Sequence, residues 1–377
     1  MGIREVGWLI FLVGLPFAHF LFKPLNLWQG QALWAQGWII LLFSLSLGNP
    51  GKTLPPNRPL AAFIAWVGLT TLFIWWRTMV DQKTYPILML QGTTHLLLLV
   101  MAYSAAMTTW TVTFVGKLVK ALALAGIAVI TYCVLQLLNL DQFLNQIDYW
   151  KNHDALVGTM GNPSHLATHL SLLFPLLLLC APLWSLALIG ILLVTQSLGG
   201  QVATFAVASY WAWHGKKKWF WVVGIVGVVG LIYLATHQDH FNPNGRFKAW
   251  SIFYQMFQQR SITGWGVGSV MAFSRTITDS TSPLFQWHHV HQEFFQVAIE
   301  HGVIGLGFLW WMLWELVGTI RRLPKTPLVV ALSGILLAFG INSLVNFPAH
   351  LWVTGSYALV AYCGLKVIEA ETGSCRS

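Results

Sequence analysis

The stretch from 286 to 305, QWHHVHQEFFQVAIEHGVIG, gathers histidines at the entrance to an apolar segment that is long enough to cross a bilayer. An imidazole, with a pKa of about 6.5, takes a proton at neutral pH, and a hydroxyl nucleophile needs that help in a transfer reaction. His291 is the candidate base. On a helix, the apolar residues three, four and seven positions later would share its face and anchor it just outside the lipid, while Glu293 and Glu300 point elsewhere. The structural alternative is an interfacial histidine that only caps the helix leading into the span.

A metal site is the second interpretation of these imidazoles. His288, His289 and His291 lie close together on one short stretch, whereas zinc sites usually draw their ligands from separated pairs. The four cysteines of the chain are scattered without a CxxC spacing. They indicate neither a disulfide framework nor a metal framework, so we predict no metal site.

A second polar cluster lies at the turn GTMGNPSHLATHL. Its Gly-Asn-Pro-Ser sequence should break one helix, and Ser164 can cap the membrane helix that follows. His165 and His169 are four residues apart and would share a face of that helix, so we expect them to be the polar lining of a cavity. Asn342 and Asn346 have the same spacing at an outer span end and are expected to form hydrogen bonds between helices.

Arg246, with Lys248 close by, is the candidate for binding an anion. A guanidinium group makes planar, two-pronged hydrogen bonds to phosphate oxygens, so an arginine in a loop near the membrane suits a lipid-linked diphosphate. The structural alternative is a solvated face or a contact with lipid headgroups. The chain has no Gly-rich phosphate loop followed by Lys-Ser or Lys-Thr and no GxGxxG that opens a soluble helix, which argues against nucleotide binding.

The whole composition is that of a polytopic helical membrane protein. Of the 377 residues, 56% are hydrophobic and only 9% are charged, and the mean hydropathy is +0.64. The length rule for bilayer spans predicts about twelve membrane helices. The predicted spans are 6–22, 30–47, 60–76, 86–107, 118–138, 164–181, 184–196, 200–213, 219–235, 302–320, 327–345 and 351–368. The seventh and eighth are short and broken by glycines, so they could be tilted, partly re-entrant or one interrupted hairpin.

The distribution of basic residues predicts the orientation. With the N-terminus inside, thirteen of the twenty-one Lys and Arg residues lie on the cytoplasmic side, including the clusters GKKK and RRLPK. Both termini would then be cytoplasmic, and the first apolar run would be an uncleaved span. The net charge of +9 is largely explained without nucleic acid as a partner.

Two segments between the spans are too long to be simple turns, and both fall on the outer side. They are 139–163, with the GNP turn, and 236–301, which would carry the active site within a single integral membrane domain of 1–377. The longer segment contains a predicted helix from 246 to 259 with five aromatic residues at helical spacing. We expect this helix to lie in the interface with its aromatic stripe in the headgroups.

Three motifs, in order along the chain, resemble those of the O-antigen ligase and Wzy-type polymerase superfamily of integral membrane glycosyltransferases. His291 and Gln292, nine further residues and then GVIG match the pattern H-[NSQ]-x9-G-x-x-[GTY]. GTMGNPSHLATHL is similar to the family's GTFGNPN-type turn, and NGRFKAWSIFYQMFQQRSITGWGVGS resembles its SGR-x-x-x-W segment with a closing GxG. The resemblance covers most of residues 155–345.

The resemblance implies a GT-C-like helix bundle in a bacterial inner membrane with a periplasmic active site. Such an enzyme moves a preassembled glycan from an undecaprenyl-diphosphate carrier to an acceptor hydroxyl, without a metal, nucleotide or other cofactor. The acceptor would be lipid A-core, another glycan or a protein, and both substrates would reach the site through membrane lipid. By this resemblance His291 would be the catalytic base and Arg246 would help to hold the donor diphosphate. The expected substrate-binding residues are Arg246, Lys248, His289, Gln292, Asn162 and His165.

The chain departs from the family pattern at one cationic position. Members commonly carry an arginine in an SRG-like sequence that ends a span, whereas this chain has TQSLGGQ, with Leu198 at the matching place. Another cation must then contact the diphosphate, or the donor binds differently. Arg77 and Lys151 are outer-side candidates.

Two further functions compete with a glycan ligase or polymerase. A protein O-oligosaccharyltransferase would share the turn and the histidine but glycosylate a protein. A transporter or flippase of lipid-linked sugars would also have about twelve spans, but it should place paired charges inside them near mid-membrane. Here Glu315 is the only clear case, and the polar groups gather at the outer face, which favours an enzyme.

Overall fold

The computed structural model describes residues 2–21, 27–47, 58–81, 86–141, 156–215, 246–276 and 289–374. Within these ranges the regular structure is entirely helical, which confirms the all-α prediction. The N-terminal half contains α1 (Ile3–Gly14), η1 (Leu15–Phe20), α2 (Leu27–Leu47), α3 (Arg58–Asp81), α4 (Pro86–Thr109), α5 (Val112–Leu137) and η3 (Gly158–Met160). The remainder contains α7 (Pro163–Cys180), α8 (Pro182–Val194), α9 (Leu198–His214), α11 (Arg246–Gln259), α12 (Ser269–Thr276), α13 (Glu293–Arg322), α14 (Pro327–Ser343), η5 (Pro348–His350) and α15 (Trp352–Ser374).

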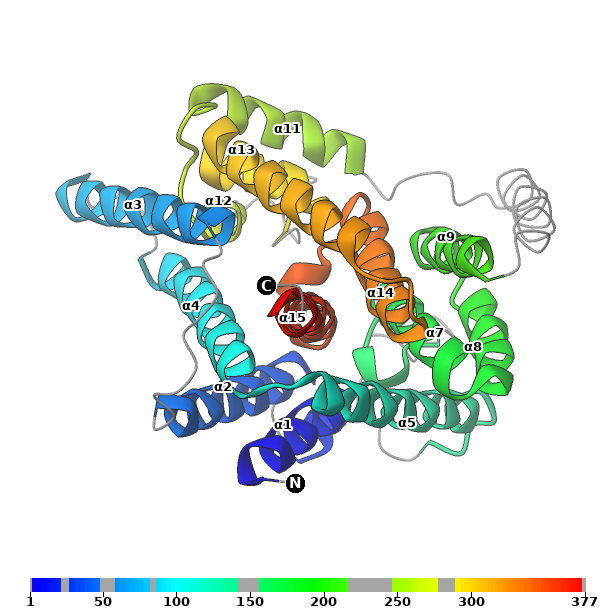
Figure 1. Cartoon of the computed structure of the whole chain (residues 1–377). Coiled ribbons are helices and arrows are strands. Elements are labelled where there is room, and N and C mark those ends of the chain that lie inside the picture. Colours follow the sequence, from blue (N-terminus) through cyan, green and yellow to red (C-terminus); the bar gives the residue numbers. More distant parts are fainter. Residues whose placement is uncertain are drawn as a thin grey trace.

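The C-terminal helix α15 occupies the middle of the bundle (Figure 1). It contacts α2, α4, α5, α7, α13 and α14, so segments from both halves of the chain are packed around it. The most extensive packing elsewhere joins α7, α9 and α14. In α7, all residues from 165 to 177 are buried, so this helix is covered on every side by protein.

Eleven of the twelve predicted spans coincide with described helices, and the run 219–235 lies outside the described residues. Four described helices are long and apolar enough to cross a membrane by length and composition: Gln29–Leu47, Val112–Leu137, Pro163–Cys180 and Glu293–Arg322. The short seventh and eighth runs form two separate helices, α8 and α9, joined by residues 195–197. A membrane bundle is therefore consistent with the structure.

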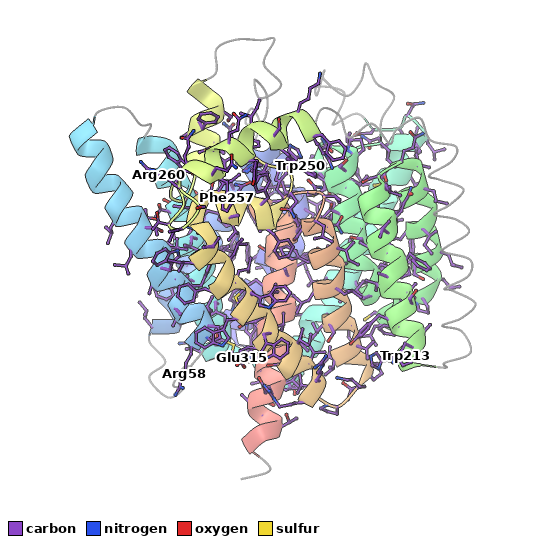
Figure 2. All side chains as sticks on the ribbon, turned by 90° about the horizontal axis from the view of Figure 1, so that it is seen from above. Arg58, Trp213, Trp250, Phe257, Arg260 and Glu315 are labelled. Atoms are coloured by element: carbon purple, nitrogen blue, oxygen red, sulfur yellow. The ribbon has the colours of Figure 1, made fainter. Side chains whose placement is uncertain are left out.

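Residues predicted for opposite membrane sides lie toward opposite ends of the bundle. Trp250, Phe257 and Arg260 lie at one end, and Arg58 lies toward the other (Figure 2). Glu315, the charge considered for a transport path, is exposed on the outside of α13. It does not line the interior of the bundle.

Helix α11 lies across one end of the bundle and has the predicted bounds (Figure 2). Three residues of its aromatic stripe pack on protein, which corrects the prediction that the whole stripe lies in lipid headgroups. Phe253 is fully buried, and Trp250 and Phe257 pack beside it against α12 and the start of α13. Phe247 and Tyr254, at the edge of the same stripe, remain exposed.

A kink divides α13 where residues 261–264 cross it. Gly302 has a φ of +67°, and a Cβ atom there would lie 2.1 Å from the carbonyl oxygen of Ile262. The Val303 N–H, released from helical pairing, donates to the Ser261 carbonyl at 2.8 Å. Residues 264–268, GWGVG, continue this backbone contact, because Gly264 would meet the Glu300 carbonyl with any side chain. Gly264 and Gly302, which come from two different motifs, therefore take part in the same close backbone contact.

Candidate functional site

Val290 fixes the short segment that carries two of the predicted site residues. Its side chain is buried, its N–H donates to Gln296 Oε1 at 3.2 Å, and its carbonyl accepts from Trp250 Nε1 at 2.8 Å. His289 and His291 flank this anchored residue in the chain. Helix α11 and the start of α13 therefore position both imidazoles.

His291 does not belong to the helix, contrary to the predicted shared face. Its φ is +57°, a left-handed conformation that a non-glycine residue adopts only where the surroundings enforce it. Gln292 is the N-cap of α13 and accepts from the Phe295 N–H with its side-chain oxygen. The left-handed residue and the cap together turn the imidazole away from the axis of α13.

The ring of Phe347 lies at the centre of the site. It is buried in the connection between α14 and α15, and four imidazoles surround it. The centroid of the His289 ring lies 4.5 Å from it, stacked, and that of His291 lies 4.6 Å away, edge-on. His165 lies at 5.0 Å and His350 at 6.5 Å. Residues far apart in the sequence thus meet around one aromatic ring.

Glu293 faces this cluster, which corrects the prediction that it points elsewhere. Its carboxylate accepts from the Ala349 N–H at 2.7 Å and lies 3.1 Å from Nδ1 of His350. Burial alone would lower the pKa of His350, but the charge and hydrogen bond of Glu293 and the charge of Glu300 together raise it above 6.5. The pair is an imidazole held in place by a buried carboxylate.

The amide of Gln296 defines the proton positions around His350. Its oxygen must face the Val290 N–H, so its NH₂ group is the one that lies 3.0 Å from Nε2 of His350. Nε2 then accepts this hydrogen bond and Nδ1 carries the proton donated to Glu293. The same NH₂ group lies 3.4 Å from both Glu300 and His289.

Arg246 reaches the site from the first turn of α11. Its Nη1 donates to the carbonyl of Val345 at 2.7 Å, two residues before Phe347. Burial, followed by the positive charge of Arg246 and the presence of His165, lowers the pKa of His291 to about 3. His291 is therefore a neutral imidazole at physiological pH.

The other predicted substrate-binding residues have varied positions. Lys248 is exposed, and Asn162 is the N-cap of α7, where it accepts from the Ser164 N–H at 2.8 Å. This corrects the assignment of the cap to Ser164.

His165 and His169 are buried against aromatic rings, His165 on Phe347 and His169 on Tyr357, and not exposed in a cavity. His288 lies outside the described residues.

The predicted hydrogen bonds of the two asparagines are confirmed. Asn342 Oδ1 accepts from the Thr168 hydroxyl at 3.0 Å, and its amide donates to Ser171 at 2.9 Å. The Asn346 amide donates to the same Thr168 oxygen at 3.1 Å. These bonds join α7 to the end of α14 and hold the segment that leads to Phe347.

Leu198, which stands where family members commonly carry an arginine, lies beside the segment that leads to Phe347. Leu198 is the first residue of α9, and the following Gly199 has no room for a side chain because its Cβ would lie 2.7 Å from Val345. Arg246 donates to the carbonyl of this same Val345. Among the described cationic groups, Arg246 is thus tied to the neighbourhood of Leu198. The side chain of Arg77 and all of Lys151 lie outside the described residues.

Sequence reasoning missed Phe347 and His350 and did not assign Glu293 and Gln296 to the site. The signal available was the segment INSLVNFPAH at an outer span end, where only the asparagines drew attention. His95 of α4 was missed as well, and its ring lies 6.4 Å from that of His350. No group of three metal-ligating side chains is arranged for a metal ion among the residues with described positions.

Comparison with known proteins agrees with the motifs. A search of curated proteins gives no match. A family model described as O-antigen ligase matches residues 183–310, which include α11, the GWGVG loop and the segment around His291. This match confirms the resemblance stated from the motifs: residues 183–310 of the chain are similar to the O-antigen ligase family.

Proposed function

We propose that this protein transfers a glycan from an undecaprenyl-diphosphate carrier to an acceptor hydroxyl at the periplasmic face of the bacterial inner membrane. The observation that carries the proposal is the convergence of Arg246 and His291 on residues 345–347. The match of residues 183–310 to the O-antigen ligase family supports the reaction class of a lipid-linked glycan donor and a separate acceptor. A bundle with apolar helices suits substrates that arrive through lipid.

The roles follow from charge and geometry. A diphosphate leaves the sugar readily when a cation stabilises its growing negative charge, and Arg246 offers a guanidinium beside the aromatic centre of the site. His291 is neutral and has a lone pair to accept the proton of the attacking hydroxyl. The protein must also position two lipid-linked substrates, and the buried, hydrogen-bonded residues around Phe347 are suited to this.

His289 and Gln292 have supporting roles in this proposal. His289 stacks on Phe347 and can contact the acceptor, whereas Gln292 caps α13 and sets the direction of His291. His165 closes the far side of Phe347, and Asn162 holds the turn before it. Lys248 is exposed and would meet only the outer phosphate or headgroups.

The test is glycan transfer in membranes or detergent with a lipid-diphosphate-linked donor. We expect His291→Ala to reduce turnover by about 100-fold or more, with unchanged abundance, and Arg246→Lys to reduce it through loss of the two-pronged contact. His214→Ala and Arg58→Lys, outside the site, are the matched controls and should retain activity. Equal turnover of His291→Ala and the wild type would contradict the role of the base.

Deletion of the gene in its host separates the possible acceptors. Loss of all capped lipid A-core on a gel of surface polysaccharide indicates a ligase, and loss of long chains alone indicates a polymerase. An unchanged polysaccharide with loss of glycan from a surface protein would instead support transfer to protein.

A further inference from the structure

The ring of Phe347 is also the first member of a longer series of ring contacts. Its centroid lies 4.5 Å from that of His289, which lies 4.5 Å from that of His350. The next centroid, that of His95 in α4, lies 6.4 Å from His350 and 4.2 Å from Trp352, the first residue of α15. We call these five residues, Phe347, His289, His350, His95 and Trp352, the ring series. It joins the connection between α14 and α15 to α4 and to the segment before α13.

Hydrogen bonds hold two imidazoles of the ring series in place. Nδ1 of His350 lies 3.1 Å from the carboxylate of Glu293, and Nε2 lies 3.0 Å from the amide nitrogen of Gln296. His95 forms a hydrogen bond with the backbone of Ala349, whose N–H donates to the same Glu293 at 2.7 Å. These rings are therefore positioned before a ligand arrives, which lowers the entropy cost of binding.

Most of the ring series is accessible, unlike the large rings of the hydrophobic core. Trp8 and Trp110 in the core are each 1% exposed, whereas Trp352 and the three imidazoles are all partly exposed. The side chain of His350 is 31% exposed, and that of Glu293 is 10% exposed. The rings can therefore meet a ligand, while the carboxylate that helps to hold them is mostly covered.

Accessible rings with nitrogen atoms at their edges suit one class of ligand in particular. A pyranose has an apolar face of C–H bonds, which packs on aromatic rings, and an edge of hydroxyl groups, which can hydrogen-bond to ring nitrogens. A diphosphate fits the ring series poorly, because the negative charges of Glu293 and Glu300 act on His350. Arg246, the proposed diphosphate contact, instead donates to the backbone two residues before Phe347.

We propose that the ring series is a sugar subsite, which binds a pyranose of one of the substrates beside the reacting groups. The sugar belongs either to the glycan on the donor or to a glycan acceptor, since both present the same chemistry. The inference rests on the proposed function and adds His95, His350 and Trp352 to it as binding residues. Because they would contact the sugar equally in the ground state and the transition state, they should affect KM more than kcat.

The test replaces the last ring of the series. Trp352→Leu keeps an apolar side chain but removes the ring, and Trp352→Phe keeps a ring. With donor and acceptor varied in turn, we expect Trp352→Leu to raise the KM of one substrate by about tenfold at nearly unchanged kcat, and Trp352→Phe to remain close to the wild type. A raised KM for the donor assigns the sugar to the donor glycan, and a raised KM for the acceptor assigns it to the acceptor.

Trp310→Leu is the matched control. It makes the same substitution at an exposed tryptophan of α13 that is not part of the ring series, so both KM values should be unchanged. His95→Leu and His95→Phe repeat the comparison from α4, so that the result does not depend on the folding of a single variant.

Binding can also be measured without turnover. The probe is the oligosaccharide released by mild acid from the surface polysaccharide of the host, free of lipid and diphosphate. Saturation-transfer NMR with the full chain in detergent should show transfer to the C–H protons of the sugar for the wild type and for Trp310→Leu. We expect most of this transfer to be lost in Trp352→Leu.

The outcomes separate this inference from the proposed function. Unchanged KM values for both substrates in Trp352→Leu and His95→Leu, or equal impairment of Trp352→Phe and Trp352→Leu, would overturn the subsite while glycan transfer by the wild type stands. Equal saturation transfer in the wild type and Trp352→Leu would overturn it too. Absence of transfer by the wild type, with a competent donor and acceptor, would refute the proposed function, whereas ring-dependent binding of the free oligosaccharide would still support a sugar site.

Discussion

Replacing Gly302 with Ala tests whether residues 261–264 and α13 form one structural unit. With φ of +67° and ψ of −172°, Gly302 lies in a backbone region that essentially only glycine adopts, which costs a residue with a Cβ atom about 1–3 kcal/mol. The new atom would also lie 2.1 Å from the Ile262 carbonyl oxygen, a distance that the backbone must relieve by moving. That movement breaks the hydrogen bond from Val303 to Ser261, worth about 1 kcal/mol. With the displaced packing we expect a loss of about 3–4 kcal/mol in stability.

Gly307 of the same helix supplies the matched control. A Cβ atom there has open space around it and the backbone is helical, so Gly307→Ala should stabilise by about 0.5–1 kcal/mol. The assay is thermal unfolding in detergent followed by the intrinsic fluorescence of the tryptophans. We expect a clearly lower midpoint for Gly302→Ala than for Gly307→Ala, together with faster proteolysis within 261–268. Equal midpoints and equal proteolysis would refute the account of the kink.

Two further substitutions test the hydrogen bonds that hold the helix ends around the site. Asn162→Ala removes the N-cap of α7 and should cost about 1 kcal/mol of stability, measured by the same thermal unfolding, without abolishing transfer. Thr168→Val keeps the shape but removes the hydroxyl between Asn342 and Asn346, and leaving these buried amides short of a partner should cost about 1–3 kcal/mol. Thr131→Val, at an exposed helix position whose hydroxyl bonds only the preceding turn, is its control and should change stability by less than about 0.5 kcal/mol.

Hydropathy predicted the helices well because each of them is encoded locally. The bounds of α11 were predicted correctly, since its aromatic residues repeat at helical spacing. The break before α13 was predicted at the wrong place. The apolar spacing continues back to His291, but the Gln292 side chain caps the helix and the residue before it is left-handed. Glutamine is an uncommon N-cap residue, so the apolar periodicity predicted a helix that begins too early.

The candidate site could be predicted only in part. His291 and Arg246 were found through motifs, whereas His350 comes from a segment about sixty residues later that meets them only after α14 has crossed the bundle. The periodicity of a sequence does not show which distant segments come into contact. Glu293 was assigned by helix geometry to another direction, because the position of His350 was unknown.

The crossing of 261–264 over α13 also bears on protein engineering. Gly264 and Gly302 bring main chain against main chain, so neighbouring side chains have little freedom to compensate for a mismatch. Chimaeras that exchange this region between relatives should therefore carry residues 246–305 as one cassette. A junction between Gly264 and Gly302 would combine segments from two proteins whose contact surfaces do not fit each other.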